Sequence, residues 1–154
     1  MTVTQQIVNG RPALRFERRL DHAIDRVWRA VTEPAELAQW FVSEVSWTPE
    51  VGEEFEAAGE TGRITAVEPP RLLAWTWGVE EYSFELTPDG DGCVLAFTHV
   101  FDPRLGPDWQ HAAGWDTYFK RLATLLAGGF LSEEDAHEGV AELIERYRTS
   151  FQLR

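Results

Sequence analysis

The side chains in this sequence that could bind a metal or act as a nucleophile or a general base include four histidines and one cysteine. His22, His99, His111 and His137 form neither an HExxH sequence nor a paired-histidine motif. Cys93 is alone, so it closes no internal disulfide and builds no cysteine-cluster zinc site. The sequence also has no GxSxG elbow and no glycine-rich phosphate loop. We therefore predict no metal, no cofactor and no assembled catalytic set.

His99 is the best single candidate for a functional polar group. It shares the bulky side of an alternating stretch with Phe97 and Phe101. An imidazole among aromatic rings could orient a ligand carbonyl, serve as a general base, or be a core histidine bonded to the backbone or to a Trp or Tyr. Asp116 and Glu85 are the nearest acidic candidates for a partner, but the helix and strand phases place both on the polar side.

A long amphipathic helix over 108–128 is the element that the rest of the chain is organised around. Its apolar residues recur at the spacing of one helical face, and they are Trp115, Tyr118, Phe119, Leu122, Leu125 and Leu126. Asp108, after Pro107, can cap the start of this helix, and Gly128-Gly129 can end it in a left-handed turn. Gly114 inside it costs roughly 1 kcal/mol relative to alanine, which suggests a close backbone approach or a bend.

Short alternating segments divided by turn residues predict a sheet. We expect strands at 14–20, 42–47, 53–58, 62–68, 71–77, 80–87 and 93–101, joined largely as an antiparallel meander. Two short helical patterns follow the first strand. The bulky side of the late strands should face the long helix, because one face of the sheet has to pack on something. The predicted fold class is therefore α+β, with a seven-stranded curved antiparallel sheet around a long helix.

The length of 154 residues fits one domain. We divide it into a loose or edge segment over 1–12, a helix-and-sheet domain over 13–128, and an additional C-terminal helix over 129–154. Ser132 suits the start of that last helix, which would cover the sheet or a partner subunit.

The charge balance argues against several classes of partner. The formal net charge is −12, whereas nucleic acids and anionic membrane surfaces attract basic patches. The chain opens without a basic-then-apolar leader, and it has no run of about 18 apolar residues. We therefore expect an acidic, cytoplasmic protein with no membrane insertion and no nucleic-acid partner.

Three stretches of the sequence resemble a known family. They are Val27–Ala30 through Trp40–Phe41, Gly62–Ile64 through Leu73–Trp77, and Gly114–Trp115 with Leu122. With the element order and His99 late in the last strand, these residues are similar to the helix-grip fold of the START-like, or SRPBCC, superfamily. More narrowly, they resemble the family named after the activator of the ninety-kilodalton heat-shock protein's ATPase. The resemblance implies a cavity between the sheet and the long helix, which the superfamily uses for lipids, sterols, polyketides and aromatic compounds.

Seven tryptophans are the unusual feature of the composition. They either fill an ordinary core or line a pocket for a flat apolar ligand. We hypothesise a binding protein whose cavity takes a hydrophobic or aromatic small molecule, with His99 and Tyr118 supplying directional hydrogen bonds and Trp40 and Phe41 edging the entrance. The predicted ligand-binding residues are Trp40, Phe41, Trp75, Trp77, Phe84, Phe97, His99, Trp115, Tyr118 and Phe119.

Two alternative functions stay open at this point. The first is an enzyme of the cyclase or hydrolase type that uses the same cavity, with His99 and Tyr118 as its polar pair. The second is an interaction module, either stress-related and chaperone-linked or homodimeric through the sheet edge or the C-terminal helix.

Overall fold

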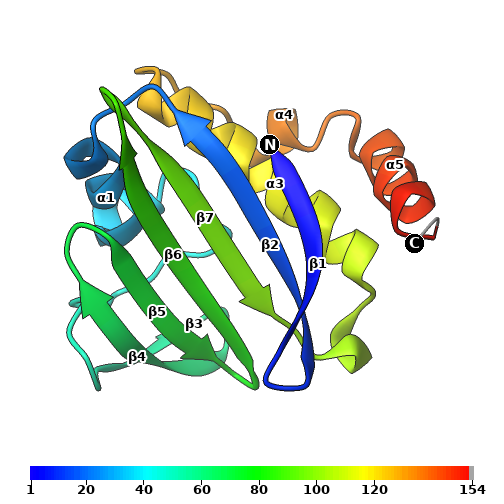
Figure 1. Ribbon diagram of the computed structural model, residues 1–154, viewed down its shortest axis with the longest axis horizontal. Coiled ribbons are helices and arrows are strands. Elements are labelled where there is room, and N and C mark those ends of the chain that lie inside the picture. Colours follow the sequence, from blue (N-terminus) through cyan, green and yellow to red (C-terminus); the bar gives the residue numbers. More distant parts are fainter. Residues whose placement is uncertain (153–154) are drawn as a thin grey trace.

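A curved antiparallel sheet of seven strands is the main layer of the computed structural model, which describes residues 1–152 (Figure 1). Along the sheet the strands are ordered β1-β2-β7-β6-β5-β4-β3. Their bounds are β1 Thr2–Val8, β2 Arg11–Leu20, β3 Glu54–Ala57, β4 Glu60–Glu68, β5 Leu72–Trp77, β6 Glu80–Asp89 and β7 Gly92–Val100. Every neighbouring pair is antiparallel, so the meander predicted from the turn residues is confirmed.

The helices lie on one side of this sheet, and α3 crosses its face (Figure 1). Their bounds are α1 Ile24–Thr32, α2 Pro34–Leu37, a short 3-10 helix η1 Pro103–Leu105, α3 Asp108–Leu126, α4 Glu133–Ala136 and α5 Val140–Gln152. The two short helices after a strand, the sheet and the long helix together confirm the predicted α+β helix-grip fold.

The ends of α3 follow from local backbone chemistry. The cap predicted at Asp108 is wrong, because Pro107 is the N-cap and no side chain caps the helix. Asp108 is the first helical residue, and its Oδ1 accepts a hydrogen bond from the Trp109 N–H at 2.7 Å. At the other end Gly128 has a φ of +91°, which a residue with a Cβ rarely adopts. The N–H groups of Gly128 and Gly129 then return to the carbonyls of Leu125 and Thr124 at 3.0 and 2.9 Å. The left-handed end predicted at Gly128 is therefore confirmed.

The bulky side of the late strands faces α3, as the alternation predicts. Leu73, Trp75, Phe84 and Phe97 are all at most 1% exposed, and they lie on successive strands of the same face. Hydrophobic burial at about 25 cal/mol per Å² makes this aromatic layer the main source of stability in the fold.

The predicted strand at 42–47 is wrong, because this stretch forms no strand. Trp47 is only 2% exposed, and its indole N–H donates to the Thr32 carbonyl at 2.9 Å. Its ring also meets Phe55 edge-on at 5.1 Å. The segment is thus held by side-chain contacts to α1 and the core, and strand pairing plays no part.

The sheet still has seven strands because β1 replaces the strand predicted at 42–47, and β1 lies within the segment expected to be loose or an edge. Thr2–Val8 pairs with Arg11–Glu17 of β2 and forms one edge of the sheet. Gln5, Gln6 and Ile7 are exposed, so neither face of this strand is buried. The sequence of β1 therefore shows no alternation of hydrophobic and polar residues.

The C-terminal segment forms two helices where the sequence predicts one. Ser132 does cap the first, because its Oγ accepts from the Asp135 N–H at 3.1 Å. Gly139 then adopts a φ of +78°, and this left-handed residue separates α4 from α5. The packing partner of α5 is α3, since the Tyr147 hydroxyl donates to Asp116 Oδ2 at 2.7 Å.

Candidate functional site

Aromatic rings in contact fill the centre of the interface between the sheet and α3. The centroid of the Phe97 ring lies 5.0 Å from that of Phe84, 4.7 Å from Trp115 and 5.3 Å from Phe119. Trp40 stacks on Phe119 at 5.9 Å in the same layer. These are the distances of offset and edge-to-face packing, so the rings interlock at this point and leave it closed to a ligand.

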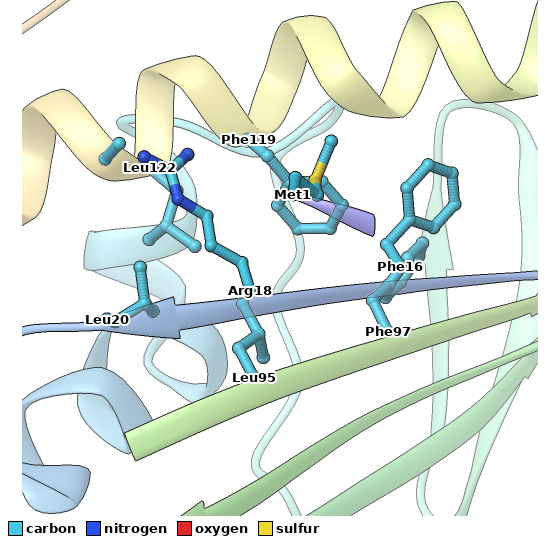
Figure 2. Close-up of a pocket in the computed structure, with 9 residues that line it drawn as sticks. Met1, Phe16, Arg18, Leu20, Leu95, Phe97, Phe119 and Leu122 are labelled. Carbon is cyan, nitrogen blue, oxygen red and sulfur yellow. The ribbon is translucent and has the colours of Figure 1, made fainter. Parts of the chain in front are cut away.

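A small apolar pocket remains beside the N-terminus, at the end of the interface where β2 finishes (Figure 2). Its lining residues are Met1, Phe16, Arg18, Leu20, Leu95, Phe97, Phe119, Leu122 and Ala123. Figure 2 shows the Met1 side chain beside Phe119, and the Arg18 side chain rising from β2 toward Leu122. The pocket volume is about 10 Å³, which is near the minimum for one water molecule. It is too small for an aromatic ligand.

A larger cleft lies at the opposite end, where β7 finishes and α3 begins. We call it the Trp115 cleft, and its volume is about 380 Å³. Its lining residues are Val42, Trp77, Glu80, Tyr82, His99, Gln110, His111, Ala113, Gly114, Trp115, Tyr118, Val140 and Ile144. The walls therefore come from β5, β6, β7, α3 and α5, with one residue from the segment after α2.

A buried polar chain joins three of these walls. The Trp115 indole N–H donates to His99 Nδ1 at 3.0 Å, and His99 Nε2 lies 2.9 Å from Glu80 Oε1. An indole nitrogen can only donate, so Nδ1 of His99 must be the accepting nitrogen and Nε2 must carry the proton that it donates to Glu80. Both ring nitrogens of His99 are consequently engaged. These two hydrogen bonds fix the tautomer of His99 and the orientation of the Trp115 ring.

Glu80 is an ionised carboxylate held by three donors. Besides His99, the Tyr82 hydroxyl donates to its Oε1 at 3.0 Å and the Asp102 N–H donates to its Oε2 at 2.8 Å. Burial raises the pKa of Glu80, but the hydrogen bonds from His99 and the Asp102 N–H outweigh it, and the net pKa lies below the ordinary value. Burial and the Glu80 charge raise the pKa of Tyr82, which keeps this hydroxyl a donor.

His111 places a second imidazole at the cleft. Its ring stands nearly perpendicular to that of His99 at 5.0 Å and lies 4.9 Å from Phe101. Its Nε2 is buried and has no hydrogen-bond partner within residues 1–152. Burial, followed by the neighbouring His99, lowers the pKa of His111. The Gly106 backbone acts in the opposite direction, but the net pKa lies below the ordinary value, so this imidazole is held neutral at pH 7.

The structure separates the ten predicted ligand-binding residues into two groups. Four of them line the Trp115 cleft, and these are Trp77, His99, Trp115 and Tyr118. The other six lie in the packed aromatic layer, and these are Trp40, Phe41, Trp75, Phe84, Phe97 and Phe119. Trp40 and Phe41 are 0% and 3% exposed, so they do not edge the cleft entrance, where the structure instead places Val42.

The acidic partner of His99 is Glu80, and neither sequence candidate takes that role. Asp116 accepts from Tyr147, and Glu85 lies 3.4 Å from Arg15 on the outer face, so both are on the polar side as expected. The sequence analysis does not predict Glu80 as a site residue, although Glu80 is two positions from Tyr82 and therefore lies on the same inward face of β6. This two-residue spacing is the feature of the sequence that points to Glu80.

Two further features bear on the chemistry of the site. Within residues 1–152 no group of three or more His, Cys, Asp or Glu side chains is arranged to hold a metal ion. No helix in that part of the chain combines the length and apolar character needed to cross a membrane.

An antiparallel sheet that grips a long helix, with two short helices after the β1–β2 hairpin, is the helix-grip architecture of the START-like, or SRPBCC, superfamily. Within that class, the family described as "Activator of Hsp90 ATPase homolog 1-like protein" matches residues 21–127, and the chain belongs to this family.

Solved structures extend the same likeness. CalU16 from Micromonospora echinospora is 24% identical, with a TM-score of 0.78 over 96% of this chain and 94% of that one. MLL2253 from Mesorhizobium loti is 26% identical, with a TM-score of 0.69 over 77% of this chain and 99% of that one. DynU16, described from the dynemicin biosynthetic locus, is 27% identical, with a TM-score of 0.66 over 77% of this chain and 48% of that one. No curated protein sequence matches the chain.

Proposed function

We propose that this chain binds a small hydrophobic or aromatic molecule in the Trp115 cleft. The observation that carries the proposal is a cleft of about 380 Å³ with four aromatic walls, Trp77, Tyr82, Trp115 and Tyr118. Ligand sites typically have roughly 300–1,000 Å³, mostly apolar walls and a few polar groups. Apolar surface leaving water, at about 25 cal/mol per Å² before ordering costs, would supply the affinity.

The rigidity of the Trp115 wall supports the same proposal. An aromatic wall binds best when its orientation is set before the ligand arrives, because less conformational entropy is then lost on binding. Glu80 and His99 provide that setting for Trp115 through two buried hydrogen bonds. In this role His99 is a positioning residue, and the ligand meets the ring that His99 holds.

Gly114 supports it from the helix side. This residue lies inside α3 and lines the cleft, and a Cβ built on it would have no heavy atom within 4 Å. No close backbone approach explains the glycine. Its missing side chain instead keeps part of the cleft empty.

The enzyme alternative gains no support from His99. A general base needs a lone pair within reach of the proton that it abstracts. The accepting nitrogen of His99 already receives the Trp115 N–H, and the other nitrogen faces Glu80. The geometry of His99 therefore favours binding over base catalysis by this residue.

The test uses a neutral aromatic probe and a variant that fills the cleft. We expect 1-naphthalenemethanol to bind in isothermal titration calorimetry and to raise the melting temperature. Gly114→Leu should weaken this binding at least tenfold, because the new side chain occupies the cleft. Ala127→Leu, at the exposed end of the same helix, should bind like the unaltered protein. Absence of binding, or equal binding by Gly114→Leu, would refute the proposal.

A further inference from the structure

The Trp115 cleft borders a second space, which we call the acidic recess. It is an open hollow of about 640 Å³ beside η1 and the turn between β5 and β6. Trp77, Glu80 and Tyr82 line both spaces, so the two spaces are neighbours. No residue of α5 lines the recess, and three carboxylates do.

Carboxylates outnumber cations around this recess. Glu60, Glu80 and Asp102 line it, against one guanidinium, that of Arg104. Arg104 Nη2 lies 2.7 Å from Asp102 Oδ2, and its Nε donates to Asp102 Oδ1 at 3.0 Å, so these two charges neutralise each other. Two negative charges, on Glu60 and Glu80, are then left without a compensating cation on the wall.

The one further guanidinium near this wall is also neutralised. Arg11 reaches the turn between β5 and β6, where its Nη2 donates to the Val79 carbonyl at 2.6 Å. Its Nη1 lies 3.3 Å from Glu81 Oε2, outside the recess. Arg11 therefore does not cancel the charge of Glu60 or Glu80.

Glu60 is the carboxylate that a ligand can reach. Its side chain is exposed and makes no hydrogen bond or ion pair with the rest of residues 1–152. It lies against the turn between β5 and β6, since a Cβ built on Gly78 would be 3.0 Å from Glu60 Oε2. Glu80 lies deeper, and three donors already occupy its oxygens. Its charge contributes to the field, while Glu60 supplies the contact.

Trp77 brings an aromatic face to the same place. Its indole N–H donates to the Ala57 carbonyl at 2.9 Å, and its ring stacks near Phe41 with an angle of 25° between the planes. These contacts fix a half-buried ring at the junction of the two spaces. An aromatic face next to a free carboxylate is the combination that recognises an ammonium group.

We infer that the ligand is a hydrophobic amine, with its apolar body in the Trp115 cleft and its protonated nitrogen in the acidic recess between Trp77 and Glu60. This inference rests on the proposed function and names the ligand class for that site. The formal net charge of −12 acts in the same direction, because it raises the local concentration of cations and repels carboxylate ligands.

Three probes that share one ring system test the inference. They are 1-naphthylmethylamine, 1-naphthalenemethanol and 1-naphthoic acid, measured by isothermal titration calorimetry at pH 7 and low salt. A cation–π contact together with an exposed ion pair is worth on the order of tenfold in affinity. We therefore expect the amine to bind on the order of tenfold more tightly than the alcohol, with the acid weakest.

Matched variants distinguish a direct contact between Glu60 and the amine from the effect of the protein's overall negative charge. Glu60→Gln should reduce the preference for the amine over the alcohol, because only the cation–π contact and the Glu80 field remain, and it should leave the affinity for the alcohol unchanged. Glu56→Gln removes the same charge from an exposed site on β3 outside both spaces, and it should preserve the preference for the amine. Raising the salt concentration should weaken the amine more than the alcohol.

The possible failures are distinguishable. If the alcohol binds and the amine binds no more tightly, the inference is overturned while the proposed function stands. If Glu60→Gln leaves the preference intact, the nitrogen lies elsewhere and the inference is again overturned. If none of the three probes binds, both the inference and the proposed function are refuted.

Discussion

Replacing Gly114 with alanine should make the protein more stable, although the residue lines the candidate site. A glycine inside a helix is less favourable than alanine by about 0.8–1 kcal/mol, since its backbone loses more freedom on folding. The gain is realised only where the added Cβ meets no neighbour and φ is already helical. Both conditions hold at Gly114, where the built Cβ has no heavy atom within 4 Å apart from its chain neighbours and the backbone of its own helix.

The expected gain is about 0.5–1 kcal/mol in the free energy of unfolding. For a chain of this size that corresponds to a rise of about 1–4 °C in melting temperature. Urea denaturation followed by circular dichroism should show a higher midpoint with an unchanged slope, because the surface exposed on unfolding barely differs. Gly128→Ala is the contrasting control, and it should destabilise the protein because the φ of Gly128 is +91°.

A loss of stability in Gly114→Ala would refute this reasoning. It would mean that a neighbour approaches the helix closely at this position, or that the helix bends there, as the sequence alone suggests. The unfilled space that supports the binding proposal would then not exist in solution.

Three further predictions follow from the same contacts. Glu80→Gln should lose about 1–3 kcal/mol of stability at pH 7. Because the folded pKa of Glu80 is lowered, the ionised carboxylate stabilises the fold above the ordinary pKa of 4.5. The difference in stability between the two proteins should therefore shrink as the pH falls below 4.5. His111 has a folded pKa below its ordinary 6.5, so the unfolded chain takes up the proton first and stability should fall as the pH drops below 6.5. His111→Phe should flatten that slope in urea denaturation at stepped pH, and an unchanged slope would contradict the assignment. Leu122→Ala, at 2% exposure beside the pocket near Met1, should lose about 2–5 kcal/mol by enlarging an apolar void, and a loss below 1 kcal/mol would show that the site collapses around it.

The main helix and the late strands could be predicted because their burial leaves a period in the sequence. Residues of α3 from Trp115 to Leu126 repeat every three or four positions, and β7 alternates from Leu95 through Phe97 to His99. β1 leaves no such period, because an edge strand with mostly exposed side chains needs no hydrophobic face. Its place is decided by pairing with β2 across a two-residue turn at Asn9 and Gly10, and that turn is a hairpin signal that the predicted meander does not use.

The candidate site was predictable only in part, for a related reason. His99 and Trp115 were found because each lies on the apolar face of its own element. Glu80 belongs to the same face, but glutamate is almost never buried without a partner, and its partner comes from the next strand. In the sheet Tyr82 pairs directly with His99, which brings Glu80 within 2.9 Å of the imidazole. Sequence spacing within one strand does not contain this register.

The contrast between the two ends of the helix–sheet interface is the strongest argument that the open end has a purpose. At the end beside Met1 the chain packs apolar side chains until only about 10 Å³ remains, so this sequence is able to close the interface. At the other end it keeps a helix-interior glycine at Gly114, which reduces stability relative to alanine. Such local departures from good packing tend to persist where function requires them. Because Gly114 lines the Trp115 cleft, and the hydrogen bonds from Glu80 through His99 hold the Trp115 ring, these features support the proposal that the cleft binds a ligand.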